Sequence, residues 1–175
     1  MSSMTSGSEA LRPPTIVYSD ESHVTGTFAN VVISSSVAEP NRGYLDNWFS
    51  TCKRLIAAQE RAAALIVIDS TAKPPGDAVR VEINGVMTSL GKGMIAIAVV
   101  VEGKGFVAAA KRSAVSMIAL LARFPFPMRI FGEVIDASSW LAQQIRAERN
   151  PAKVEANVLV AATEAIRREA PFGHA

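Results

Sequence analysis

The polar residues best placed to do chemistry come directly after two apolar runs of the chain. Asp69, Ser70 and Thr71 follow the run ALIVI, and Glu102 and Lys104 follow the run MIAIAVVV. If these runs are neighbouring parallel strands, their carboxyl ends meet at one edge of a sheet, where open parallel sheets bind ligands. We therefore predict a candidate ligand or partner site at these five residues. The alternative is that they are solvated charges and hydroxyls of ordinary loop ends.

The hydroxyls of Ser70 and Thr71 are also candidate phosphoacceptors. Phosphorylation would place a dianionic group beside this predicted site. The alternative is structural, because Ser and Thr side chains in turns commonly hydrogen-bond the loop's own backbone.

Histidine, cysteine and glycine patterns give no catalytic constellation. The chain has two histidines, so a metal site or a serine triad would depend on His23, because His174 is next to last. The one cysteine, Cys52, falls on an apolar helix face, where burial favours an inert thiol. GVMTSLGKGM has the wrong spacing for a phosphate-binding loop, and GKGF lacks the third glycine of a dinucleotide fingerprint. We predict no catalytic residue, no metal and no cofactor.

Hydrophobic periodicity indicates the elements that must position these residues. The first clear helix has apolar residues at helical spacing on one face: Leu45, Trp48, Phe49, Cys52, Leu55 and Ile56. Four strands are expected at 15–20, 27–35, 64–69 and 94–101, and a fifth at 128–131. Helices are expected at 45–61, around 79–90, at 106–124, at 135–148 and at 151–169.

The alternation of helices and strands from residue 45 predicts an α/β fold. Its sheet should be mixed and mostly parallel, with helices on both faces. We expect a disordered leader over 1–13, one domain over 14–148, and a C-terminal helix and tail over 149–175. The last helix, starting with Pro151, would cover either its own domain or a second copy.

Composition and charge narrow the classes of partner. The net charge is +2 and no cluster of five or more Lys and Arg occurs, so no nucleic-acid partner is expected. Lys111, Arg112 and Arg123 on one expected helix form either a face for an acidic partner or a solvated face. The apolar runs are too short to span a membrane, and the N-terminus does not follow the order of a signal peptide. We expect a cytoplasmic protein.

Three segments in a fixed order carry a resemblance: LIVIDSTAKPP, then AIAVVVEGKGFVAAAKRSAVSMIALLARFPFPMRIF, then DASSWL. Together they resemble the STAS/CRAL-TRIO-like superfamily, in particular the SpoIIAA-like bacterial proteins, over roughly residues 14–145. The positions that match are Asp69, Pro74, Pro75, Pro125, Pro127, Phe131, Ala137, Trp140 and Leu141. The resemblance implies that Trp140 and Leu141 close the fold by packing against the sheet.

The resemblance implies a binding function rather than a reaction. Classical members are partners of kinases and anti-sigma factors, and some are switched by phosphorylation at a helix N-terminus. The segment IDSTAKPPGD departs from that switch motif, because no glycine directly follows its hydroxyl residues. We predict a non-enzymatic protein-interaction or regulatory module.

Two other functions stay open at the level of the sequence. The alternative is a small carrier that holds an apolar or lipid-like ligand between sheet and helices, and an internal cavity would favour it. An enzyme would need Asp69 and Glu102 in a cleft with perturbed carboxylates. The apolar surplus of the helices at 106–124 and 151–169 also predicts a homodimer.

Overall fold

Six strands form one sheet in the same order as they occur in the chain. The computed structural model describes residues 12–149 and 154–172, so residues 1–11 of the expected leader lie outside the described residues. The strands are β1 (Thr15–Ser19), β2 (His23–Phe28), β3 (Val31–Ser36), β4 (Ala62–Ile68), β5 (Met94–Val101) and β6 (Met128–Phe131). The pairs β1–β2 and β2–β3 are antiparallel, whereas β3 to β6 pair in parallel. The predicted mixed, mostly parallel sheet is confirmed.

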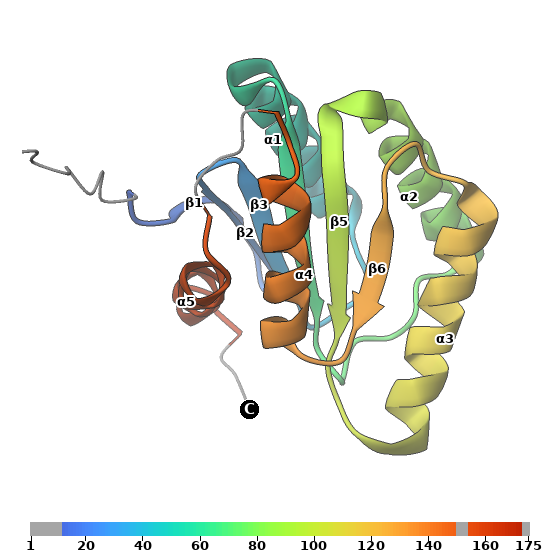
Figure 1. Cartoon of the computed structure of the whole chain (residues 1–175). Helices are drawn as coiled ribbons and strands as arrows, with labels where there is room; N and C mark the ends of the chain where they lie inside the picture. Colours follow the sequence, from blue (N-terminus) through green and yellow to red (C-terminus); the bar gives the residue numbers. More distant parts are fainter. Residues whose placement is uncertain (1–11, 150–153, 173–175) are drawn as a thin grey trace, which may run out of the picture.

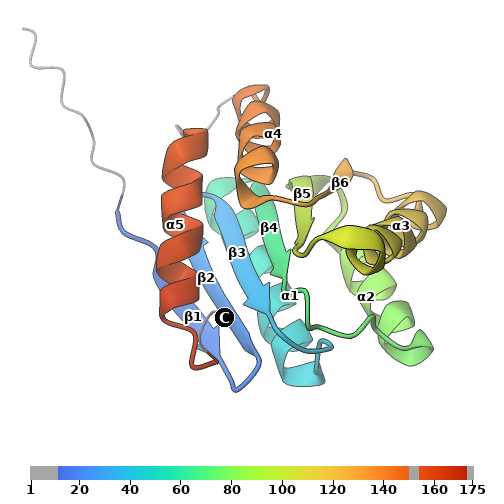
Figure 2. The same cartoon turned by 90° about the horizontal axis from the view of Figure 1, so that it is seen from below.

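Helices cover both faces of this sheet (Figures 1 and 2). One face carries the helices that connect the parallel strands: α1 (Arg42–Gln59), α2 (Asp77–Leu90) and α3 (Gly105–Ala122). The other face carries α4 (Val134–Arg146) and α5 (Ala156–Arg168). A short turn of 3₁₀-helix, η1 (Gly91–Gly93), leads from α2 into β5. None of the described helices is long and apolar enough to cross a membrane.

The C-terminal helix packs on its own domain. Leu159 and Ile166 of α5 are fully buried against β2, β3 and α4. A Cβ atom at Gly26 of β2 would lie 2.7 Å from Cδ1 of Ile166, so glycine there allows this close approach. Because α5 buries its apolar face within the chain, that face no longer supports the predicted homodimer.

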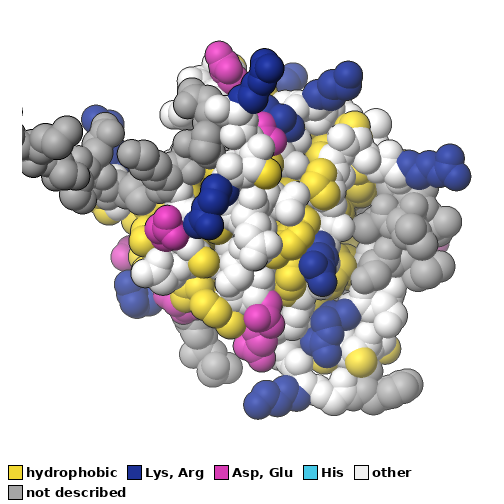
Figure 3. Space-filling view, viewed as in Figure 1, with side chains coloured by type: hydrophobic (Ala, Val, Ile, Leu, Met, Phe, Trp, Pro, Cys, Tyr) yellow, Lys and Arg dark blue, Asp and Glu magenta, His cyan; other side chains and the backbone are white. Residues whose placement is uncertain are grey.

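Helix α4 lies on the face of the sheet that is turned to the viewer in Figures 1 and 3. Leu141 of α4 is fully buried in the core of this face, and Trp140 packs at its edge. The rings of Trp140 and Phe131 lie 5.6 Å apart between centroids. The expected packing of Trp140 and Leu141 against the sheet is confirmed.

The N-terminal strands and the start of the last helix differ from the predictions. Residues 27–35 are not one strand: β2 ends at Phe28, Ala29 and Asn30 form a tight turn, and β3 begins at Val31. Asn favours such a turn, and Ala29 adopts a positive φ of 50° there. Helix α5 begins at Ala156 rather than at residue 151, and Pro151 itself lies outside the described residues.

Candidate functional site

The predicted strand-end residues lie together at the carboxyl edge of β4 and β5. The backbone N–H of Glu102 donates to the carbonyl of Ile68 across 2.9 Å, and that of Asp69 donates to Ser36 of β3. Gly103 packs against Ser70, because a Cβ at Gly103 would lie 3.0 Å from the Ser70 Cβ. The residues that follow β4 and β5 therefore lie at one edge of the sheet, as the sequence predicted.

The side chains at this edge turn to different partners. One oxygen of Asp69, Oδ1, accepts from the Thr71 backbone N–H at 2.7 Å and from the Thr71 hydroxyl at 2.6 Å. Both carboxylate oxygens of Glu102 instead accept from Arg167 of α5, each at 2.9 Å. Lys104 is exposed and occupies the N-cap position of α3, where its side chain makes no capping hydrogen bond. Asp69 and Thr71 thus shape the loop after β4, whereas Glu102 connects α5 to the sheet through its hydrogen bonds with Arg167.

Two basic residues of α3 donate hydrogen bonds to backbone carbonyls at the same edge of the sheet. Lys111 Nζ donates to the carbonyls of Ser70 and Ala72 at 2.6 and 3.0 Å. Arg112 donates to the carbonyls of Val101 and Gly103 at 3.2 and 3.3 Å. Both cations therefore act in positioning the loops that follow β4 and β5.

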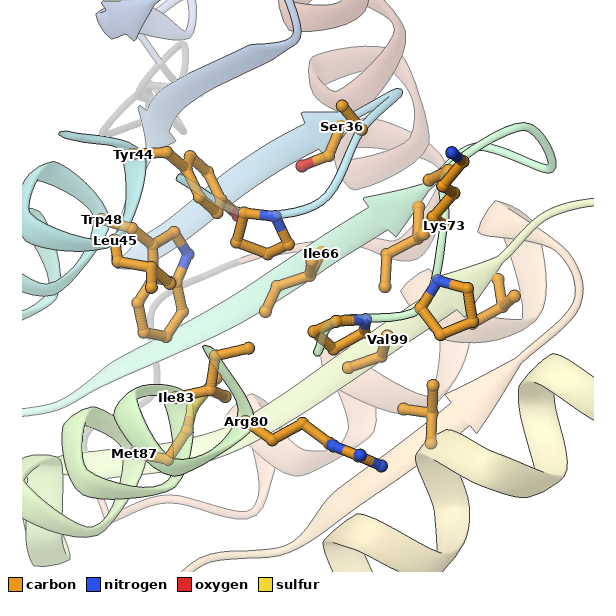
Figure 4. A pocket seen from close by; sticks show the side chains of 18 of the residues that line it. Ser36, Tyr44, Leu45, Trp48, Ile66, Lys73, Arg80, Ile83, Met87 and Val99 are labelled. Atoms are coloured by element: carbon orange, nitrogen blue, oxygen red, sulfur yellow. The ribbon is translucent and has the colours of Figure 1, made fainter. Parts of the chain in front are cut away.

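An apolar cavity of about 160 Å³ lies beside this edge, between the sheet and helices α1 and α2 (Figure 4). Its wall comes from helices α1, α2 and α3, strands β3 to β6, the loop before α1 and the loop after β4. The apolar and aromatic lining residues include Pro40, Tyr44, Leu45, Trp48, Ile66, Ile68, Pro74, Pro75, Ile83, Val86, Met87, Val99 and Val101. The helical spacing that predicts buried faces for α1 and α2 accounts for five of these side chains, but the two helix faces do not close on one another. The five are Leu45, Trp48, Ile83, Val86 and Met87.

The indole of Trp48 puts an unused polar group in this wall. The side chain is 2% exposed, and no hydrogen-bond partner exists for its Nε1 among the described residues. Figure 4 shows the nitrogen-bearing edge of the ring on the side that faces the other labelled lining residues. A buried donor without a partner costs free energy, so an acceptor on a ligand would be favoured here.

Basic side chains stand where the cavity meets the surface. Lys73, Arg80 and Lys111 line it, and no Asp or Glu is among its lining residues in the described part of the chain. Arg80 pairs with Asp77 one helical turn earlier, and the Arg80 side chain is 43% exposed. We call these three residues the basic rim.

A hydrogen-bond network around Asp20 supports the loop before α1. The Asp20 carboxylate accepts from Tyr18 Oη at 2.7 Å, from Asn41 Nδ2 at 2.9 Å and from two backbone N–H groups, and it lies 2.9 Å from His23 Nδ1. Burial alone would raise the pKa of Asp20, but these hydrogen bonds outweigh burial and hold its pKa well below its ordinary value. Burial and the Asp20 carboxylate raise the pKa of Tyr18 to about 12.

This network connects the two loops of the cavity wall. His23 Nε2 lies 3.2 Å from the carbonyl of Glu39, and Glu39 Oε1 accepts from the N–H of Gly76 at 2.7 Å. The loop that contributes Pro40 is thereby joined to the loop that contributes Pro74 and Pro75. His23 is a structural histidine here, with both ring nitrogens engaged and its ring stacked on Tyr44.

Sequence reasoning missed these groups for identifiable reasons. Asp20 and His23 flank a turn in the segment SDESH, and Asp before a turn signals carboxylate capping of backbone N–H groups. The sequence around Arg80 does not mark it as a site residue, because basic residues are common beside the apolar face of a helix. Cys52 is buried as predicted, and its burial raises the pKa of the thiol.

Comparison with known proteins adds no relative to this description. A scan of the sequence against protein-family models gave no match, and a search of curated proteins gave none either. The chain is an α/β protein with a six-stranded mixed sheet.

Proposed function

We propose that this chain is a non-enzymatic binding module that holds a small, mainly apolar ligand between the sheet and helices α1 and α2. The observation that carries the proposal is the apolar cavity of about 160 Å³ at the carboxyl ends of β4 and β5. Native cores are packed to crystal-like density and hold few voids larger than a water molecule. A void lined by so many large apolar side chains is therefore better explained by a ligand than by imperfect packing.

The side chains that could act as nucleophile or base support binding over catalysis. His23 directs both ring nitrogens to structural partners, and Cys52 lies on the buried face of α1. Asp69 and Glu102, the carboxylates that an enzyme would need in one cleft, accept hydrogen bonds from Thr71 and Arg167. The proposal therefore contains no chemical step.

The two tryptophans of the chain provide a direct test. In a Trp140→Phe variant the remaining Trp48 reports on the cavity, whereas in Trp48→Phe the remaining Trp140 packs against Phe131 outside it. Each variant is titrated with phenylacetate and with phenylacetamide, whose one ring suits the cavity. We expect a saturable change of fluorescence in the Trp48 reporter alone. No saturable change with either probe, together with no shift in melting temperature of the unmodified protein, would refute the function.

We propose that the fold is that of a SpoIIAA-like protein of the STAS type, because its helices and strands follow the order seen in the resemblance. The support is the succession of β4, a proline-bearing loop, α2, β5, α3, a proline corner, β6 and a helix with Trp140 and Leu141. An experimental structure whose strands pair in a different order would contradict this assignment.

A regulatory protein-interaction module is the second candidate function. The supporting observation is a pair of exposed valines, Val81 of α2 at 73% and Val107 of α3 at 67%, each in the first turns of a helix that begins at the carboxyl edge of the sheet. We propose that this region contacts a second copy of the chain in a homodimer. Native mass spectrometry should then give a dimer mass that Val81→Asp and Val107→Asp reduce to the monomer. A monomer at micromolar concentration would contradict the dimer.

A further inference from the structure

We infer that the ligand of this cavity is a monocarboxylate with an apolar part about the size of one aromatic ring, and that Arg80 binds its carboxylate. The inference rests on the proposed function and adds two properties to it, charge and size. Charge comes from the basic rim, and size comes from the volume of the cavity.

The charged groups of the cavity all have one sign. Lys73, Arg80 and Lys111 line it without a carboxylate among the described lining residues. Two carboxylates of the adjoining loops are engaged elsewhere, Asp69 with Thr71 and Glu39 with the N–H of Gly76. Asp77 pairs with Arg80 of the rim itself, on the exposed side of α2. A neutral ligand would gain nothing from three cations at the opening. An anionic ligand would gain charge-assisted hydrogen bonds at the edge of an apolar, low-dielectric space.

Arg80 is the member of the rim that is best placed to exchange partners. Its pair with Asp77 is on the surface, the Asp77 side chain is 92% exposed, and exposed pairs of this kind contribute little to stability. Figure 4 shows the Arg80 side chain extending from α2 away from Ile83 and below Val99, while Lys73 lies on the loop that follows β4. The planar guanidinium can hold a carboxylate through two parallel hydrogen bonds. Lys111 already donates to two carbonyls and keeps one further donor.

The volume limits the apolar part of the ligand. About 160 Å³ is close to the size of engineered apolar cavities of about 150 Å³ that bind benzene. One ring or a compact alkyl group of similar size therefore fits, whereas the chain of a membrane lipid does not. Trp48 Nε1 lies in the wall without a hydrogen-bond partner among the described residues, which additionally favours an acceptor on the buried part of the ligand.

The test compares two probes of nearly identical shape, phenylacetate and phenylacetamide. Binding of each to the full-length protein is measured by calorimetry at low and high salt, with laurate as a probe of size. We expect phenylacetate to bind about tenfold more tightly than the amide, the lower end of the range for a hydrogen bond to a charged group. Added salt should weaken the acid and leave the amide unchanged. Laurate should bind more weakly than phenylacetate.

Substitution of the rim locates the carboxylate. Arg80→Met keeps the length of the side chain and should remove the preference for the acid, and Lys73→Met should reduce it. Arg42→Met is the matched control, because Arg42 is also a surface arginine of a helix, paired with Asp46, and is not a lining residue. This variant should bind both probes as the unmodified protein does.

The possible results separate this inference from the function on which it rests. Equal binding of acid and amide would overturn the inference and leave an apolar binding site standing. Binding of neither probe would overturn both. A preference for the acid that survives Arg80→Met and Lys73→Met would mean that the anionic group is not held at this rim, and tighter binding of laurate would overturn the limit on size.

Discussion

Filling the cavity with a larger side chain should stabilise the protein, which is the opposite of the usual result in a core. Val86 lies on α2 and lines the cavity, and Val86→Phe adds about four carbon atoms, worth about 0.8 kcal/mol each when buried. Ordering the larger side chain offsets about 1 kcal/mol of this gain. The expected net increase in the free energy of unfolding is about 2 kcal/mol, the upper end of what cavity-filling substitutions commonly give.

The cavity volume sets an upper limit on this gain. At roughly 24 cal/mol per Å³, filling all of the 160 Å³ would contribute at most about 4 kcal/mol. The basic rim stands at the surface, so part of that volume is solvated and the true gain is smaller. A single phenylalanine that recovers a fraction of the limit is consistent with the estimate from added carbon atoms.

Urea unfolding, followed by circular dichroism, measures this change. Thr88→Phe is the matched control, because Thr88 lies on the same helix, is exposed and does not line the cavity. The control should change the free energy of unfolding by no more than about 0.5 kcal/mol. Val86→Phe should also abolish binding of phenylacetate. A loss of more than about 1 kcal/mol in Val86→Phe, with the control unchanged, would show that the space is already filled and that the reasoning is wrong.

Three further predictions concern the elements around the site. Asp20→Asn should lower the free energy of unfolding by about 2 kcal/mol at neutral pH, since it removes a carboxylate that several donors stabilise. Because the pKa of Asp20 is depressed in the folded protein, Asp20 contributes to the free energy of unfolding above the ordinary Asp pKa of about 4. That contribution is lost as the pH falls below this value. Urea unfolding from pH 6 to pH 2 should therefore show a smaller pH dependence in Asp20→Asn than in the unmodified protein. Ile166→Ala should cost about 2–5 kcal/mol in the same assay without changing the oligomeric state, because Ile166 is fully buried within its own chain; a change of dimer mass with unaltered stability would contradict this. If Ser70 or Thr71 is a phosphoacceptor, mass spectrometry of the denatured protein isolated from cells should show a phosphate-sized increase that Ser70→Ala with Thr71→Ala removes, and an unshifted mass would count against the switch.

The parts of the fold that could be predicted are those fixed by local patterns. Strands β5 and β6 have the predicted bounds because continuous apolar runs between turn residues leave few alternatives. Strand β2 was missed because its sequence, HVTGTF, is too polar in pattern and contains Gly26. That glycine is explained by Ile166, which approaches it from the far end of the chain. No reading of residues 23–28 alone could supply this contact.

The edge of the sheet at which the polar residues gather could be predicted from the sequence, but none of the five predicted residues lines the cavity. The polar residues after β4 and β5 marked the correct edge of the sheet, yet Glu102 is engaged by Arg167, which lies 65 positions later. The cavity could not be predicted from the sequence. Apolar residues repeat at the same helical spacing whether a helix face packs tightly on the sheet or leaves a void. What distinguishes them is the packing of α1 and α2 on β4 and β5, a property of the whole fold.

The residues first predicted as the site still bear on binding through the loop that they shape. Asp69 and Thr71 fix the turn after β4, and Lys111 holds two carbonyls of the same loop. That loop then contributes Lys73 and two prolines to the cavity wall, and Glu39 fastens its far end at Gly76. Prolines restrict the backbone, so few conformations remain for a segment held at both ends. The polar strand ends thus act as positioning groups for an apolar cavity, which explains how hydroxyls and a carboxylate can lie at a binding edge without themselves contacting the ligand.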